Sequence, residues 1–200
     1  MNKKIIGVVG KKLSGKGTFG TFVQEILAPR NVVLVSFSDV LRDTLSDWGL
    51  PVSRHNLQRL AIIMNHEFGE GTLTRAVLLR LKNIDTDIVV IDGIRWLSDR
   101  DILRQIPGFQ MVYITADIKV RYARRKAGQK VGEAEVPWEQ FLKEEHAETE
   151  VYIEDIGQGA EYTIENNGTE EEFRAHILDF SAQYEDLAES ISARSSYTRH

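Results

Sequence analysis

The sequence predicts a three-layer α/β fold, in which a five-stranded parallel sheet carries helices on both faces. The first observation is that short, β-branched apolar runs alternate along the chain with segments of helical periodicity. The second is that most of these runs are apolar throughout, which is typical of strands buried on both faces of a sheet. The predicted strands lie at residues 5–9, 31–36, 87–91, 109–115 and 161–164. A chain of 200 residues, 42% of them hydrophobic, suits one such domain.

Capping residues and apolar spacing predict the helices between these strands. The expected helical segments are 16–27, a wholly helical stretch within 38–86, a short helix capped by Ser98, 117–126 and 137–156. Residues 169–172 (Thr-Glu-Glu-Glu) have the capping-box pattern and open a long last helix. Along that helix an apolar stripe is formed by Phe173, Ile177, Phe180, Tyr184, Leu187 and Ile191. Such a stripe is typical of core contact with the sheet, and a dimer seam is the alternative.

Domain boundaries follow from the same pattern. We expect residues 1–192 to form a single domain and residues 193–200 to form a disordered tail. Two segments are interpreted as insertions into the sheet framework. One is the helical stretch 38–86, and the other is the charged, loop-rich segment at about 124–140.

Composition and charge exclude several classes of protein. The absence of cysteine excludes a disulfide scaffold, a cysteine zinc site and a thiol nucleophile. No apolar run is long enough to cross a membrane, and Lys11 and Lys12 interrupt the apolar N-terminal run before it resembles a signal peptide. We therefore expect a cytoplasmic protein with no membrane partner.

The net charge of −5 combines a basic excess before residue 130 with an acidic excess after it. A nucleic-acid binder would carry an extended basic surface, so we expect no nucleic-acid partner. The positive charge lies where a small anion would sit. We interpret the acidic C-terminal third as a solubilising surface.

The strongest functional signal is the glycine-rich segment 10–18 (Gly-Lys-Lys-Leu-Ser-Gly-Lys-Gly-Thr) between the first strand and the first helix. This pattern in this context is that of a phosphate-binding P-loop, so the predicted fold is that of the P-loop NTPases. Glycines let backbone N–H groups turn toward phosphate oxygens, and the helix N-terminus adds partial positive charge. We expect ATP to bind here, with Lys16 reaching the β- and γ-phosphates. The expected contacts are Gly10, Lys12, Leu13, Ser14, Gly15, Lys16, Gly17 and Thr18. A glycine-rich turn without a ligand is the alternative.

A second signal is Asp92 at the carboxyl end of the third strand, followed by Gly93, Ile94 and Arg95. A carboxylate in this place can order Mg²⁺ and its waters beside the phosphates, so we expect Thr18 and Asp92 to hold the metal. Arg95 lies just past the strand end, where its planar guanidinium can grip a substrate phosphate. Taken alone, Asp-Gly also makes ordinary turns.

Three motifs resemble those of adenylate kinases. Residues 15–18 (Gly-Lys-Gly-Thr) are similar to that family's phosphate loop, the displaced threonine included. Residues 38–42 (Ser-Asp-Val-Leu-Arg) resemble its Gly-Asp-(Leu/Met)-Leu-Arg segment. Residues 92–95 (Asp-Gly-Ile-Arg) resemble its Asp-Gly-x-Pro-Arg motif, shortened by one residue and without the proline. In the order of its parts the resemblance covers about residues 1–180.

This resemblance implies a nucleoside monophosphate kinase-like fold, with an acceptor-binding insert at 38–86 and a lid at about 124–140. The acceptor-binding residues that it implies are Ser38, Asp39, Arg42, Asp92 and Arg95. For Arg42 an ion pair with Asp39 or Asp43 on its own helix is the alternative. A phage-type deoxynucleoside monophosphate kinase is a further relative that these motifs leave open.

The basic helix predicted over 117–126 resembles the lid-entry helix of these kinases, whose arginines flank the adenine and clamp the transferring phosphoryl group. The resemblance gives this role to Arg121 and Arg125, and a solvated charged face is the alternative. The returning side of the lid departs from the family, because residues 143–150 (Lys-Glu-Glu-His-Ala-Glu-Thr-Glu) contain no arginine. Residues 160–168 resemble a loop near the base in dephospho-coenzyme A kinases, which gives Asn167 a place beside the nucleotide. A turn that caps the last helix explains this segment equally well.

Together these signals predict an enzyme that moves the γ-phosphate of ATP, with Mg²⁺, to a small-molecule nucleoside or deoxynucleoside monophosphate. The predicted catalytic residues are Lys16, Arg42, Arg95, Arg121 and Arg125. They act through position and charge, because an ionised acceptor phosphate needs no general base. Two alternatives stay open. One is phosphorylation of a ribose hydroxyl, as in dephospho-coenzyme A kinases, with Asp39 as the base. The other is a nucleotide-binding switch with little turnover. Monomer and homodimer are both open.

Overall fold

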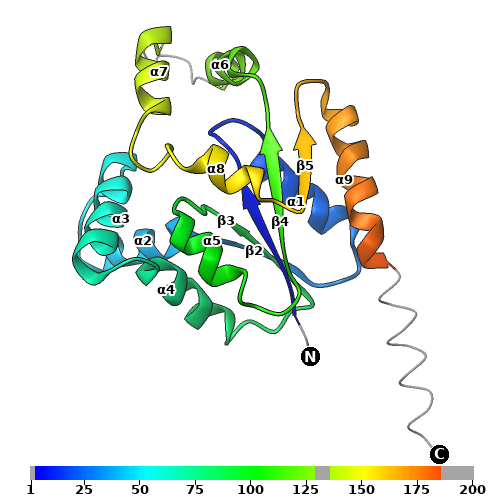
Figure 1. Cartoon of the computed structure of the whole chain (residues 1–200), viewed down its shortest axis with the longest axis horizontal. Coiled ribbons are helices and arrows are strands. Elements are labelled where there is room, and N and C mark those ends of the chain that lie inside the picture. Colours follow the sequence, from blue (N-terminus) through cyan, green and yellow to red (C-terminus); the bar gives the residue numbers. More distant parts are fainter. Residues whose placement is uncertain (1–2, 129–135, 186–200) are drawn as a thin grey trace, which may run out of the picture.

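A computed structural model of the chain describes residues 3–128 and 136–185. Its elements are β1 (Lys4–Val9), α1 (Lys16–Ile26), β2 (Val32–Ser36), α2 (Phe37–Asp47), α3 (Arg54–Phe68), α4 (Thr72–Leu81), β3 (Ile88–Asp92), α5 (Leu97–Leu103), β4 (Phe109–Thr115), α6 (Ile118–Ala127), α7 (Trp138–Glu145), α8 (Ile153–Gln158), β5 (Tyr162–Glu165) and α9 (Glu170–Glu185). The five strands form one parallel sheet in the order β2-β3-β1-β4-β5, with helices on both faces (Figure 1). The predicted fold class is confirmed.

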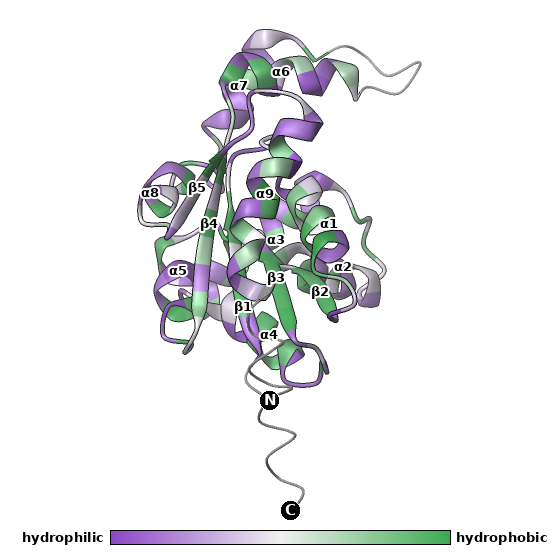
Figure 2. Ribbon diagram, turned by 90° about the vertical axis from the view of Figure 1, so that its right-hand side faces the viewer, coloured by the Kyte–Doolittle hydropathy of each residue, from purple (hydrophilic) through white to green (hydrophobic). Residues whose placement is uncertain are grey.

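Alternate residues of each strand supply two apolar cores, as the two-residue period of a strand requires. From β1, Ile5 and Val9 enter the core shared with α2, α3, α4, α5 and α8, whereas Ile6 and Val8 enter the core shared with α1 and α9. Figure 2 shows the hydrophobic strands β1 and β3 among these helices. The sheet is therefore buried on both faces, which explains why its central strands read as unbroken apolar runs.

The apolar stripe of the last helix packs on the sheet, as predicted. Phe173, Ile177, Phe180 and Tyr184 are all buried in the core that α9 shares with α1. The remainder of the predicted stripe and the predicted tail at 193–200 lie outside the described residues.

Strand register brings the carboxyl ends of the three neighbouring strands level. Asp92, the last residue of β3, is opposite Val8 of β1 and Ser36 of β2. In parallel sheets this edge is where ligands bind, at the point where the strand order changes direction.

The start of α5 differs from the prediction, which put its cap at Ser98. The helix begins at Leu97, because the Asp99 carboxylate accepts hydrogen bonds from the backbone N–H groups of Trp96 at 3.2 Å and Arg95 at 3.3 Å. A carboxylate in the first helical turn is a good acceptor for these unpaired donors. Asp99 thereby fixes the turn that carries Arg95.

The predicted helix over 137–156 is wrong as a single element. It is two helices, α7 and α8, separated by residues 146–152. The chain leaves the helical path where Thr149 and Glu150 turn into the protein, and both are buried. Part of the predicted lid, residues 129–135, lies outside the described residues. Within the described part of the chain, no helix is long and apolar enough to span a membrane.

Candidate nucleotide site and acceptor-side cavity

The loop between β1 and α1 is closely enclosed by its neighbours. A Cβ atom at Gly10 would lie 2.3 Å from the backbone oxygen of Ile114. Gly15 has φ 110°, in the left-handed region, and a Cβ there would lie 2.3 Å from Asn166 Nδ2. Both positions therefore require glycine, which lets the loop turn its backbone N–H groups inward.

Lys16 is the first residue of α1, and its side chain folds back over the loop. Its Nζ donates to the backbone oxygens of Gly10 at 2.8 Å and Lys11 at 3.1 Å. Burial lowers the pKa of Lys16, and the negative charge of Asp92 opposes this shift. The ammonium group thus lies in the electrostatic range of the carboxylate at the end of β3.

Two buried oxygens beside this loop point to a polar ligand. Ser14 Oγ and Asp92 Oδ1 are buried without a hydrogen-bond partner among the described residues. Buried polar atoms are rarely left unsatisfied in folded proteins, so each such atom calls for an explanation. A triphosphate and its bound waters would supply partners at this position.

A cavity of about 360 Å³ opens on one side of the loop. Its lining residues are Leu13, Gly15, Thr18, Arg124, Asn166, Gly168, Glu170 and Phe173. Arg124 Nη2 donates to the backbone oxygen of Asn166 at 2.8 Å, and Arg124 Nη1 donates to that of Leu13 at 3.2 Å. Asn166 Nδ2 donates in turn to the backbone oxygen of Ser14 at 2.8 Å. These bonds join α6 and the β5–α9 loop to the phosphate loop.

On this side of the loop, the cavity is lined in each case by the residue that precedes the predicted one in the sequence. The cavity is lined by Arg124 and Asn166, not by Arg125 and Asn167. The Oδ1 atom of Asn167 accepts from the backbone N–H of Asp117 at 2.7 Å, so this side chain fixes the start of α6 instead. Successive residues of a helix point about 100° apart. The four-residue spacing of Arg121 and Arg125 alone therefore does not show which arginine of this helix faces the cavity.

A second cavity, of about 210 Å³, opens on the other side of the loop at the ends of β2 and β3. It is lined by three of the predicted acceptor residues, Ser38, Asp92 and Arg95, and by Lys12 of the phosphate loop. Arg54 and Gln58 of α3 also line it, together with apolar side chains that include Leu57 and Trp96. Arg54 was not predicted from the sequence; it is the first residue of α3, directly after the Ser53 cap.

Arg42 and Asp39 are not among the residues that line this cavity. Arg42 is exposed, and its Nη1 pairs with Asp39 Oδ1 at 3.1 Å on the same helix. The Oδ2 atom of Asp39 accepts from the backbone N–H of Ser36 at 2.8 Å and completes a capping box. The structure therefore shows the ion-pair alternative for Arg42 and a capping role for Asp39.

The two predicted metal ligands line different cavities. Thr18 is exposed and lines the 360 Å³ cavity, whereas Asp92 lines the 210 Å³ cavity. The displacement of the threonine by one residue turns it away from Asp92 around the helix. No cluster of three or more His, Cys, Asp or Glu side chains suited to a metal ion occurs among the described residues. The assignment of Thr18 and Asp92 as magnesium ligands therefore stays a prediction.

Arg121 is buried and committed to protein partners. Its guanidinium forms two bonds with the Glu145 carboxylate, at 2.8 and 2.7 Å, and further bonds with the backbone oxygens of Ala116 at 3.1 Å and Lys12 at 3.2 Å. These bonds use most of its N–H donors. The geometry assigns Arg121 a structural position between α6, α7 and the phosphate loop, which differs from the predicted clamp on a phosphoryl group.

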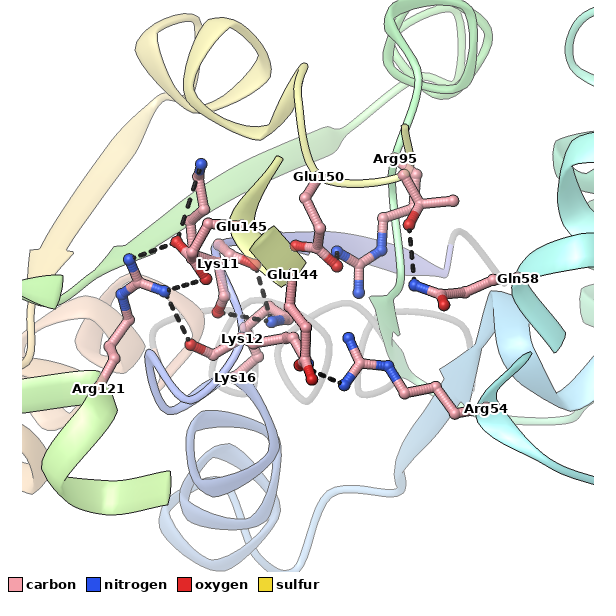
Figure 3. A network of polar contacts seen from close by, with 12 residues as sticks. Lys11, Lys12, Lys16, Arg54, Gln58, Arg95, Arg121, Glu144, Glu145 and Glu150 are labelled. Carbon is pink, nitrogen blue, oxygen red and sulfur yellow. Dashed lines mark hydrogen bonds and ion pairs between the residues drawn. The ribbon is translucent and has the colours of Figure 1, made fainter. Parts of the chain in front are cut away.

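The segment of residues 144–150, the acidic strap, lies against the cations of the site (Figure 3). Glu144 pairs with Lys12 and with Arg54, the latter at 2.9 Å. Glu150, which is 2% exposed, places its Oε1 2.9 Å from Arg95 Nη1. The strap thus supplies carboxylates, and no arginine, to the cations of the site.

The fold matches that of solved P-loop kinases. Solved structures similar to the chain include the shikimate kinase from Acinetobacter baumannii, at 20% identity and TM-score 0.51, covering 94% of each chain. They also include a gluconokinase from Sinorhizobium meliloti 1021, at 17% identity and TM-score 0.51, covering 97% of this chain and 98% of that chain. This likeness supports the fold broadly and does not single out adenylate kinases.

Among curated proteins, a UPF0200 protein from Methanoregula boonei is 30% identical over 179 residues, covering 88% of this chain and 94% of its relative. A UPF0200 protein from Thermococcus onnurineus is 26% identical over 180 residues, covering 88% of this chain and 95% of its relative. The chain belongs to the UPF0200 family. No protein-family model matches it.

Proposed function

We propose that the protein is an ATP-dependent phosphotransferase that acts on a small molecule, with a nucleoside or deoxynucleoside monophosphate as acceptor. The observation that carries this proposal is the position of the Lys16 loop between two cavities. The 360 Å³ cavity lies beside Leu13 and Thr18, and the 210 Å³ cavity lies beside Lys12 and Asp92. A donor nucleotide and an acceptor can therefore approach the same loop from opposite sides, which is the arrangement that in-line transfer requires.

In this proposal ATP lies on the phosphate loop with its base in the 360 Å³ cavity. The Arg124 guanidinium and the Phe173 ring line that cavity and can contact a planar base. Lys16 stabilises the charge of the β- and γ-phosphates from the first turn of α1. P-loop enzymes commonly bind ATP together with Mg²⁺, which neutralises part of the phosphate charge.

The acceptor lies in the 210 Å³ cavity, with its phosphate toward Arg95, Arg54 and Lys12. The apolar side of this cavity, which includes Leu57 and Trp96, suits the remainder of the molecule. Transfer then depends on position and charge, because the acceptor oxygen is already ionised. Transfer to a ribose hydroxyl with Asp39 as the base finds less support, since both Asp39 oxygens serve Ser36 and Arg42.

The test is a phosphoryl-transfer assay. Purified protein is incubated with ATP, Mg²⁺ and, separately, each of the common ribo- and deoxyribonucleoside monophosphates and dephospho-coenzyme A, and products are separated by chromatography. Formation of a diphosphate from one acceptor class supports the proposal. Tight ATP binding without transfer to any acceptor would favour the nucleotide-binding switch.

Two variants locate the reaction within the structure. Lys16→Met should lower turnover at least a hundredfold, about 2.7 kcal/mol of transition-state stabilisation, without loss of fold. Arg42→Ala is the matched control, because Arg42 is exposed and paired only with Asp39 on its own helix. If Lys16→Met retains wild-type turnover, the loop assignment is wrong.

A further inference from the structure

Asp99 is a buried carboxylate that serves two separate elements, with only 1% of the residue exposed. Its Oδ2 atom accepts hydrogen bonds from the backbone N–H groups of Arg95 at 3.3 Å and Trp96 at 3.2 Å. Its Oδ1 atom accepts a hydrogen bond of 2.6 Å from Thr74 Oγ1 of α4, and Thr74 is itself fully buried. A single side chain therefore joins the turn that carries Arg95 to a helix of the 38–86 insert.

A helix cap alone does not require this burial. The chain offers a direct comparison in α2, where the exposed side chain of Asp39 accepts from the backbone N–H of Ser36. Burial removes solvation from the charged form of Asp99 and raises its pKa, whereas the Asp39 carboxylate stays in contact with water. Asp39 bonds within its own helix and cap, while Asp99 also reaches Thr74. The burial of Asp99 therefore goes together with the link between two helices.

This link lies directly behind the wall of the 210 Å³ cavity. Neither Asp99 nor Thr74 is among the residues that line the cavity. Leu73, which precedes Thr74, does line it, and so does Arg95. The Arg95 guanidinium meets Glu150 at 2.9 Å, so Arg95 is held by Asp99 at its backbone and by Glu150 at its charged end (Figure 3). Any effect of Asp99 on a ligand in the cavity therefore acts through Arg95 and its turn.

We propose that Asp99 and Thr74 are positioning residues, through which α4 fixes Arg95 for the phosphate of the acceptor. The proposal rests on the proposed function and adds two residues that do not touch the substrate. Ordering a long side chain when a ligand binds costs conformational entropy, and a backbone that is fixed beforehand lowers this cost. Without the Asp99 carboxylate two backbone N–H groups lose their acceptor, so the turn loosens and Arg95 must be ordered by the ligand.

The test measures binding of inorganic phosphate to the full chain by isothermal titration calorimetry, without ATP, and circular dichroism checks the folding of each variant. Asp99→Ala removes the carboxylate, and Thr74→Val removes only the bond from α4. Asp99→Asn is the conservative variant, because its amide oxygen can accept from the backbone while its amide nitrogen donates to the Thr74 hydroxyl.

Two controls separate positioning from general effects. Each variant is also made in an Arg95→Gln background, which separates binding that depends on Arg95 from binding at the phosphate loop. Ile177→Ala is the matched control for lost stability. Ile177 is fully buried between α9 and the sheet and lines neither cavity.

We expect Asp99→Ala to bind phosphate about two- to tenfold more weakly than the wild type, the range that the ordering of one long side chain covers. Thr74→Val should weaken binding by a smaller factor, because Asp99 still accepts from the backbone. Asp99→Asn should bind phosphate as the wild type does. Both losses should disappear in the Arg95→Gln background, and Ile177→Ala should leave phosphate affinity unchanged although it lowers stability.

Several results would overturn the proposal. One is a folded Asp99→Ala variant with wild-type phosphate affinity, and wild-type affinity in Thr74→Val has the same meaning if Asp99→Ala does not fold. A loss in Asp99→Asn as large as that in Asp99→Ala would also contradict it. An equal loss in Ile177→Ala, or a loss that persists in the Arg95→Gln background, would show a general effect on the fold. Phosphate binding by the wild type that does not depend on Arg95 would overturn it as well. Because no ATP is present, these outcomes are independent of the phosphoryl-transfer assay.

Discussion

The buried pair of Arg121 and Glu145 allows a quantitative prediction. Each side chain is 6% exposed, and two short hydrogen bonds join them. The variant Glu145→Gln keeps the size of the side chain and removes its charge, so the guanidinium stays buried beside an amide that can accept only part of its bonds. Removal of one partner from a buried ion pair costs 3–5 kcal/mol in general, and the retained amide oxygen places the expected loss near the lower end, about 3 kcal/mol.

The assay for this prediction is equilibrium unfolding in urea, followed by circular dichroism. With a denaturant dependence of about 2 kcal/mol per molar urea, the midpoint should fall by about 1.5 M. The exposed control Glu148→Gln should change the free energy of unfolding by less than about 0.5 kcal/mol. The double variant Arg121→Met/Glu145→Leu should recover part of the loss, because an apolar pair carries no desolvation cost, while the backbone oxygens of Ala116 and Lys12 lose a donor. A Glu145→Gln midpoint equal to that of the wild type, or a double variant less stable than the single one, would refute this reasoning.

Three further predictions concern the loop, a buried acid and the core. Gly15→Ala should destabilise the protein by more than about 1 kcal/mol and weaken ATP binding, because of its positive φ and the contact with Asn166 Nδ2; calorimetry measures both. Burial raises the pKa of Asp99 despite its bond from Thr74 Oγ1, so the folded state binds this proton more tightly than the unfolded state. The contribution of Asp99 to stability should therefore fall as the pH rises above 3.8, the ordinary pKa of an aspartate. Urea titrations of the wild type and of Asp99→Asn at about pH 4 and pH 7 should show that the variant gains stability relative to the wild type at the higher pH. Ile177→Ala should cost about 2–5 kcal/mol in the same titration, because this side chain is fully buried between α9 and the sheet, and a loss below 1 kcal/mol would contradict that placement.

The fold could be predicted from the sequence because its signals are local. The apolar runs of β1 and β3 are buried on both faces, and their composition alone shows this. The segment 10–18 specifies a strand, a tight turn and a helix through the positions of its glycines. Helix α5 begins two residues before the predicted start, because the Asp99 carboxylate accepts a hydrogen bond from the backbone N–H of Arg95 and this outweighs the local signal at Ser98.

Details of the site were harder to predict because they depend on side-chain direction. Arg42 and Arg54 lie on neighbouring helices, and only Arg42 was predicted from a motif. Arg42 pairs with Asp39 on its own helix, whereas Arg54 reaches Glu144. The direction of an arginine around a helix changes by about 100° per residue, so a motif that matches by letters can still point elsewhere. The same uncertainty separated Arg124 from Arg125.

In the folded chain, glutamates from the acidic C-terminal part pair with cations from the basic N-terminal part. The basic part of the chain supplies Lys12, Arg54 and Arg95 to one cavity. The acidic part supplies Glu150 to the same cavity and Glu144 to ion pairs with Lys12 and Arg54. An acidic surface that only kept the protein soluble would not bury a carboxylate to 2% exposure beside an arginine. Residues 143–150, which contain no arginine, place carboxylates against these cations instead. Any anion that binds to Lys12, Arg54 or Arg95 must therefore compete with a carboxylate that is already in place.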